Sequence, residues 1–291
     1  MSRLFCFGLG YSALHVARNL AAEGWSIAGT ARTAEGTAAI AARGYDAITF
    51  DGTAPAPEMA AALSGATHIL VSIPPGDEDP VLRHHLEDLR KQSTLRWIGY
   101  LSTVGVYGDT QGAWIDETGP TDARSVRGRR RVEAESRWLE LGQALGIPTH
   151  VFRLAGIYGP GRSAIDRLRA GTAHRIVKPH QVFNRIHVKD IARTVHAAMA
   201  AKEASGIFNV TDDEPAPPQD VVTYAAELLG VAPPPEIPFA EAELSPMARS
   251  FYADNKRVSN VRLRQELGVA LQFPTYREGL RAIAGGEPAA G

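Results

Sequence analysis

The chain has 291 residues, of which 44% are hydrophobic, and its 31 basic and 32 acidic residues leave a formal net charge of −1. This composition is typical of one large globular domain or two intimate ones, and it argues against a disordered chain or a nucleic-acid-binding protein. No apolar run approaches the length of a membrane span, the N-terminus lacks a signal-peptide pattern, and the single cysteine, Cys6, has no partner for an internal disulfide. We therefore expect a cytoplasmic protein without nucleic-acid or membrane partners.

The first segment with a functional signal is an apolar run, residues 3–7, followed by Gly8-Leu9-Gly10-Tyr11-Ser12-Ala13 and an alanine-rich helical pattern. This G-x-G-x-x-A spacing between a strand and a helix is typical of a dinucleotide-binding turn. Gly8 permits the tight turn, Gly10 lets the backbone approach a pyrophosphate, and Ala13 lets the helix pack closely on the strand. The N-terminus of the helix then offers N–H groups to the phosphates. The alternative is a glycine-rich turn in an unrelated α/β protein.

Residues 25–32 read as a second strand, and the residue at its end bears on the choice of cofactor. An NAD site usually has an acidic residue there, which binds the ribose 2′-hydroxyl. This chain has Arg32 followed by Thr33. Because a guanidinium suits a 2′-phosphate, the sequence favours NADP over NAD. The alternative is an exposed arginine at the end of a strand.

Two further strands are expected to end at the cofactor. Asp51, at the end of the third strand, is placed either to contact the adenine or to cap the following turn. Ser72, Ile73 and Pro74, at the end of the fourth strand, are expected along the cofactor at the edge where the strand order reverses. The predicted elements of this part are helices 34–43 and 58–63, strand 45–51, and a strand that runs into a loop within 67–75.

Strands continue to alternate with helices up to residue 154, which predicts parallel βαβ units and a doubly wound sheet. Beyond it, proline clusters interrupt shorter elements. We therefore expect residues 1–154 to form a nucleotide-binding domain to which 181–211 return, and 155–180 with 212–291 to form a smaller substrate-binding lobe. The remaining predicted elements are helices 79–92, 129–145, 191–201 and 220–229, strands 95–102, 149–154 and 206–211, and further helices within 262–284.

Five ordered motifs together resemble the extended short-chain dehydrogenase/reductase superfamily, in its NAD(P)-dependent epimerase/dehydratase group. The resemblance implies an α/β fold with a Rossmann-type doubly wound parallel sheet and a smaller C-terminal substrate lobe. It also implies a nicotinamide cofactor and a small-molecule substrate. A homodimer is compatible with the sequence, which does not decide the oligomeric state. The motifs are residues 8–13, Ser102–Gly108, Arg153–Arg162, Asn184–Asp190 and Asn255–Asn260.

The resemblance also implies a catalytic set, and this chain departs from it. In the superfamily a Ser or Thr, a Tyr and a Lys do the chemistry, and Thr103 matches the hydroxyl position. With Gly128 matched to the glycine often found between the other two, Arg127 stands at the Tyr position and Arg131 at the Lys position. Arginine stays protonated in proteins, so it cannot replace the Tyr as acid or base at neutral pH. The departure is similar to the atypical subgroup, which keeps the cofactor fold but agrees poorly at the active site.

Other side chains near these motifs have weaker support for a chemical role. Asp79 is a stand-in for a fourth superfamily residue, an Asn. Tyr107 and Tyr158 are the nearby phenols, and a structural role is favoured for both.

Four arginines fall within residues 127–131, and Arg127 and Arg131 share a helix face. Cations at a helix N-terminus oppose the macrodipole, so an anion is expected nearby. The candidates are a cofactor phosphate, an acidic substrate, or Glu133 and Glu135; the alternative is a solvated basic surface.

The sequence thus leaves two hypotheses open. One is an NADP-dependent oxidoreductase or epimerase-like enzyme on a small, anionic hydroxyl or carbonyl compound. The other is a cofactor-binding sensor or scaffold whose chemistry has lapsed.

Overall fold

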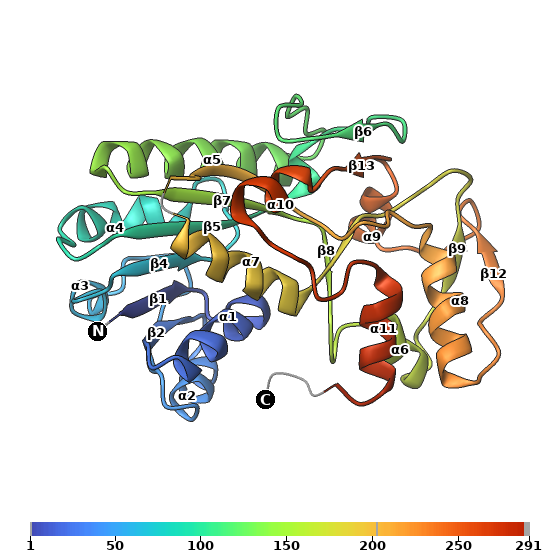
Figure 1. The fold of residues 1–291 in the computed structure, drawn as a ribbon, viewed down its shortest axis with the longest axis horizontal. Helices are drawn as coiled ribbons and strands as arrows, with labels where there is room; N and C mark the ends of the chain where they lie inside the picture. Colours follow the sequence, from blue (N-terminus) through green and yellow to red (C-terminus); the bar gives the residue numbers. More distant parts are fainter. Residues whose placement is uncertain (1, 202, 288–291) are drawn as a thin grey trace. The chain divides into compact units, whose positions relative to one another are not determined.

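A seven-stranded sheet forms the core of the first of two units in the computed structural model, which describes residues 2–201 and 203–287. The strand order is β11-β7-β5-β4-β1-β2-β3, and Figure 1 shows the labelled strands β7, β5, β4, β1 and β2 side by side in this order. The four pairings from β3 to β5 are parallel. The strands are β1 Arg3–Phe7, β2 Ser26–Ala31, β3 Asp46–Thr49, β4 His68–Val71, β5 Trp97–Thr103, β7 Thr149–Leu154 and β11 Gly206–Val210.

Both faces of this sheet are buried, as the strand β1 shows. Alternate residues of a strand point to opposite faces. Phe5 and Phe7 belong to a buried cluster that also contains Leu82 of α4 and Trp138 of α5, while Leu4 and Cys6 on the other face are equally buried. The predicted Rossmann-type doubly wound fold is confirmed. The helices of this unit are α1 Tyr11–Ala22, α2 Ala34–Ala41, α3 Met59–Ala62, α4 Pro80–Arg90, α5 Val126–Leu145, the 3₁₀ turn η1 Val104–Val106, and most of α7 Val188–Ala200.

The order of the strands reverses at β1, which has β2 on one side and β4 on the other. In open sheets of this kind, ligands bind beyond the carboxyl ends of the strands at such a switch point. The predicted cofactor residues 8–13 and 72–74 follow β1 and β4 directly, so the fold brings them to one edge of the sheet.

The second unit is built from short elements. Its strands form three parallel pairs, and a buried cluster that includes Ile165, Val221 and Leu280 joins the helices α6, α8 and α11. The pairs are β6 Trp114–Ile115 with β13 Arg257–Val258, β8 Gly156–Tyr158 with β10 Arg185–His187, and β9 Arg175–Val177 with β12 Glu236–Pro238. The helices are α6 Ala164–Arg169, α8 Pro218–Leu229, α9 Pro246–Phe251, α10 Val261–Leu267 and α11 Tyr276–Ala284.

The division of the chain differs in detail from the expected one. Tyr107–Asp122 belongs to the second unit, where its strand β6 pairs with β13. The segment expected to return to the first unit, 181–211, is divided: β10 pairs with β8 in the second unit, and Ala192–Phe208 lies in the first. The first unit is Met1–Val106, Ala123–Arg153 and Ala192–Phe208, and the second is Tyr107–Asp122, Leu154–Ile191 and Asn209–Gly291.

Two helices begin three residues earlier than the pattern predicts. α5 begins at Val126, because Ser125 caps it by accepting a hydrogen bond from the Gly128 N–H, and this places Arg127 inside the first turn. α7 begins at Val188. Among the described helices, none is both long and apolar enough to cross a membrane.

Candidate functional site

The turn after β1 requires glycine. Gly8 has a φ of +83°, and a Cβ placed on it would lie 2.9 Å from the Ile73 side chain and 3.0 Å from Ser72 Oγ. The Gly8 N–H donates to Thr30 Oγ1 on β2 at 2.8 Å, and Ser72 Oγ donates to the Gly8 carbonyl. The first glycine is therefore held between β2 and the end of β4, at the switch point.

The N-terminus of α1 fits a pyrophosphate. Its N-cap residue is Gly10, and no side chain caps it, whereas Thr33 caps α2 and Ser125 caps α5. A Cβ on Gly10 would meet no atom within 4 Å, so open space lies beside this backbone. Uncapped N–H groups at a helix N-terminus bind phosphates well, and the missing side chain leaves room for one. The contacts of Leu9, Tyr11, Ser12 and Ala13 with a cofactor stay predictions.

Arg32 follows β2 directly and is exposed. Within the described residues, its guanidinium has no hydrogen bond or ion pair. The next residue, Thr33, accepts a hydrogen bond from the Gly36 N–H at 3.2 Å and so fixes the start of α2 beside it. Arg32 thus offers an unpaired cation next to a helix N-terminus, which is the arrangement that an adenosine 2′-phosphate needs.

Asp51 has hydrogen-bond partners of its own. Its Oδ1 accepts from the Thr53 N–H at 2.8 Å and from Thr53 Oγ1 at 2.7 Å, and these bonds lower the pKa of the Asp51 carboxyl. The contacts match the turn-capping alternative, and contact with the adenine stays a prediction.

The strand β5 ends at Thr103, whose Oγ1 accepts from the Gly105 N–H at 3.1 Å. α5 packs directly on the turn that follows. A Cβ on Gly128 would lie 2.8 Å from the Gly105 carbonyl oxygen and 2.6 Å from the Ala123 side chain. The glycine therefore lets the first turn of α5, which carries Arg127, approach the turn beside Thr103.

The structure separates the arginines of α5 by their partners. Arg129 donates to the Arg124 carbonyl at 2.8 Å, and Arg130 pairs with Asp77 in the loop after β4. Arg131 donates to the Leu101 carbonyl on β5, and its guanidinium lies 5.7 Å from the centre of the Tyr100 ring. Arg127 is exposed and has no such partner in the described part of the chain.

A buried charged network beneath this site was not predicted from the sequence. Glu135 and Arg153 are each 3% exposed, and Arg153 binds the Glu135 carboxylate in a fork, with Nη2 2.7 Å and Nε 3.2 Å from Oε2. Ser102 Oγ, one residue before Thr103, donates to Glu135 Oε1 at 2.5 Å. Of the anions considered for the arginine cluster, Glu135 directs its carboxylate to Ser102 on β5 and Arg153 on β7, and Glu133 is exposed. The feature of the sequence that draws attention to Glu135 is its position one turn after Arg131.

The weaker candidates have structural contacts. Asp79 caps α4, accepting from the Val81 and Leu82 N–H groups at 3.0 Å, and it also accepts from Trp138 Nε1 at 3.0 Å. Burial raises the pKa of Asp79. In the second unit, Tyr107 donates to Asn209 Oδ1 at 2.8 Å, and burial raises the pKa of Tyr158.

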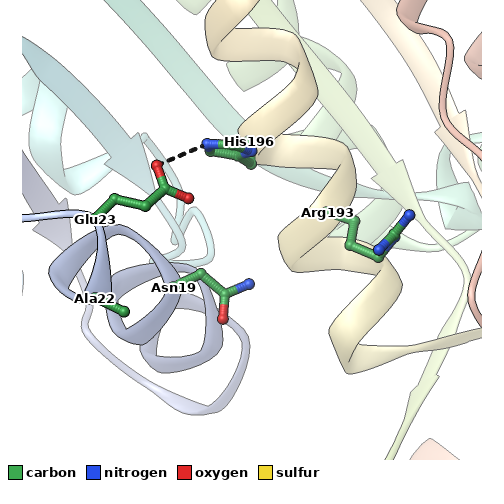
Figure 2. A pocket seen from close by; sticks show the side chains of 5 residues that line it. All are labelled: Asn19, Ala22, Glu23, Arg193 and His196. Carbon is green, nitrogen blue, oxygen red and sulfur yellow. Dashed lines mark hydrogen bonds and ion pairs between the residues drawn. The ribbon is translucent and has the colours of Figure 1, made fainter.

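One cavity of about 390 Å³ lies at the other end of α1. Figure 2 shows Glu23 at this end pointing towards His196 of α7, with which it pairs at 3.1 Å, and the other lining residues are Asn19, Ala22 and Arg193. A helix of 12 residues places its C-terminus about 18 Å from its N-terminus, so this cavity is not the cofactor site. No group of three or more metal-ligating side chains occurs among the described residues.

Comparisons with known proteins agree with the fold. The model of the NAD dependent epimerase/dehydratase family matches residues 84–211. A solved structure of a functionally unknown conserved protein from Silicibacter pomeroyi DSS is 47% identical, with a TM-score of 0.87 over 98% of this chain and 99% of that one. Protein YeeZ from Escherichia coli K12 is 29% identical over 94% of this chain and 97% of its own length. A 3-diazoavenalumate denitrifying reductase from Streptomyces sp. is 32% identical over 57% of this chain and 55% of its own length.

Proposed function

We propose that this chain, whose residues 84–211 match the model of the NAD dependent epimerase/dehydratase family, belongs to that family and is an NADP-dependent oxidoreductase or epimerase-like enzyme. Its substrate is a small hydroxyl or carbonyl compound that carries a negative charge. The observation that carries the proposal is a pair of unpaired guanidinium groups, Arg32 beside the start of α2 and Arg127 beside the turn after Thr103. In this proposal Arg32 lies at the site of the cofactor's 2′-phosphate, and Arg127 lies at the site of the substrate.

The cofactor part of the proposal rests on residues of the first unit. The uncapped start of α1 and the open space beside Gly10 receive the pyrophosphate, and Arg32 receives the 2′-phosphate. Ser72 holds the Gly8 turn in place through its hydrogen bond to the Gly8 carbonyl. When bound, the nicotinamide supplies or accepts a hydride.

The substrate part assigns two roles at the end of β5. The Thr103 hydroxyl binds the reacting oxygen, and Arg127 binds an anionic group of the substrate or stabilises negative charge that develops on that oxygen. Neither group donates a proton at neutral pH. Tyr100 does not fill this role, since its ring is fully buried under Arg131 and burial raises the pKa of its phenol.

Because neither side chain donates a proton, fewer classes of substrate are compatible with this site. Two classes of hydride acceptor suit these residues best. In the first, a guanidinium stabilises the negative charge that forms on the acceptor when the hydride arrives. In the second, the acceptor needs no proton at that step. Keto acids belong to the first class. The name of one relative, a 3-diazoavenalumate denitrifying reductase, is the reason to add diazo compounds to the test panel as an alternative to hydroxyl and carbonyl compounds.

The test is NADPH oxidation measured against a panel of keto acids, sugar phosphates, neutral aldehydes and diazo compounds, together with NADPH binding by fluorescence. We expect turnover with at least one anionic compound and none with its neutral analogue. Tight NADPH binding without turnover of any compound refutes the enzyme and favours the second candidate, a cofactor-binding sensor or scaffold. The observation behind that candidate is the arginine at the position of the usual Tyr.

A further inference from the structure

The network of Ser102, Glu135 and Arg153 lies directly beneath the proposed reaction site, and neither the family resemblance nor the proposed function gives it a role. We infer that Glu135 is a positioning residue: held by Arg153, it fixes the end of β5 through the Ser102 hydroxyl and so sets where Thr103 stands relative to Arg127. This inference rests on the proposed function, in which these two side chains bind the substrate.

The contacts form a clamp between one helix and one strand. Arg127, Arg131 and Glu135 are spaced by four residues and share a face of α5. Arg131 donates to the Leu101 carbonyl, and Glu135 accepts from the Ser102 hydroxyl. Consecutive residues of β5 are thus held by consecutive turns of α5, immediately before Thr103.

Arg153 fixes the orientation of the Glu135 carboxylate. Its Nε lies 3.2 Å from both carboxylate oxygens, and its Nη2 lies 2.7 Å from Oε2. A planar guanidinium bound in this way defines the plane of the carboxylate, and Oε1 is left directed at Ser102. Because Glu135 and Arg153 are almost fully buried, water does not compete for these bonds.

A chemical role for the network is less consistent with its geometry than a positioning role. The carboxylate is 3% exposed and already accepts from two side chains. The side chain of Ser102 is also buried and points at Glu135. Thr103, the next residue of the strand, is only half-buried. The network therefore acts on substrate through the position of Thr103.

The experiment uses Ser102→Ala, which removes only the link to β5 and leaves the buried ion pair intact. Ser102→Thr, which restores a hydroxyl, is the rescue variant. The matched control is Trp138→Phe, which removes another side-chain hydrogen bond of α5, the one to Asp79. Turnover of the compound found in the substrate panel is measured with NADPH affinity and thermal stability for each variant.

We expect Ser102→Ala to lower kcat by about 10- to 100-fold, the loss typical of a reacting group displaced by roughly 1 Å, with NADPH affinity unchanged. Ser102→Thr restores most of kcat, and Trp138→Phe leaves it unchanged. Equal losses of kcat in Ser102→Ala and Trp138→Phe, in step with their stabilities, overturn the inference.

A second readout needs no turnover, so it separates this inference from the proposed function. The methyl resonance of Thr103, assigned with Thr103→Ser, reports the position of that side chain in the whole protein. We expect this resonance to shift or broaden in Ser102→Ala, to return in Ser102→Thr and to stay in place in Trp138→Phe. An unchanged resonance in Ser102→Ala refutes the positioning role even if no compound of the panel is turned over.

Discussion

Replacing Arg32 with alanine is expected to remove most of the preference for NADP. The guanidinium is exposed, and no acidic side chain in the described part of the chain pairs with it, so its loss leaves no buried partner behind. A hydrogen bond to a charged group contributes about 1.5–3 kcal/mol. Since solvent and salt screen an exposed pair, we expect the lower end, about 1.5 kcal/mol, which is about tenfold in Kd.

The assay is a fluorescence titration with NADPH and with NADH, at low and at physiological salt. Arg32→Ala should weaken NADPH about tenfold while NADH changes little, and the difference should shrink as salt rises. The matched control is Arg18→Ala, which removes another exposed, unpaired arginine, on α1. If the ratio of the two affinities is the same before and after Arg32→Ala, the argument from the end of β2 is refuted.

Three other changes test separate parts of the account. Arg127→Tyr with Arg131→Lys should weaken phosphate and carboxylate ligands by about tenfold, because the double variant loses the unpaired Arg127 guanidinium, and titration calorimetry measures this. Arg153→Met should lower the free energy of unfolding, measured in urea, by about 3–5 kcal/mol, since it leaves the Glu135 charge buried without its partner. Burial lowers the pKa of His68 to about 4, so the stability it contributes is present above pH 6.5 and is lost as the pH falls towards 4. His68→Phe should therefore reduce the loss of stability between pH 7 and 4.5 by about 1 kcal/mol, a value discounted for its partly exposed ring.

Each of these three changes has its own contrary outcome. The double variant contradicts the role of the arginines if its titrations match the parent for cofactor, phosphate and carboxylates alike. Arg90→Ala, which breaks an exposed pair with Glu87, is the control for Arg153→Met, and equal costs for the two would contradict the burial argument. An identical pH dependence of unfolding in His68→Phe and the parent would show that this ring titrates normally when folded.

The fold was predictable because its signals are local. The alternation of strands and helices marks the βαβ units, and Gly8 at positive φ marks the turn at the switch point. The ends of several elements were misplaced, and short elements of the second unit such as β9 and β12 were not predicted. Residues 67–75 were predicted as a strand that runs into a loop, and the strand ends at Val71, before the two prolines, which lack a backbone donor.

The site was less predictable, because its contacts join distant segments. The sequence offers Glu135 only as one of several anions for the arginine cluster, and the structure pairs it with Arg153 on β7. The sequence places four arginines together without indicating that three of them have intramolecular partners: Arg129 in the chain just before α5, Arg130 in the β4 loop and Arg131 on β5. These pairings depend on how α5 packs on the sheet, which no local pattern encodes.

The central claim is that the protein transfers a hydride between NADP(H) and an anionic substrate. The most direct measurement is an incubation with NADPH carrying deuterium at the reactive carbon of the nicotinamide, with each compound of the substrate panel, followed by mass spectrometry of the products. The account predicts deuterium in the product of at least one anionic compound, and no transfer in the Arg127→Ala variant. Bound NADPH that delivers no deuterium to any compound would contradict the claim.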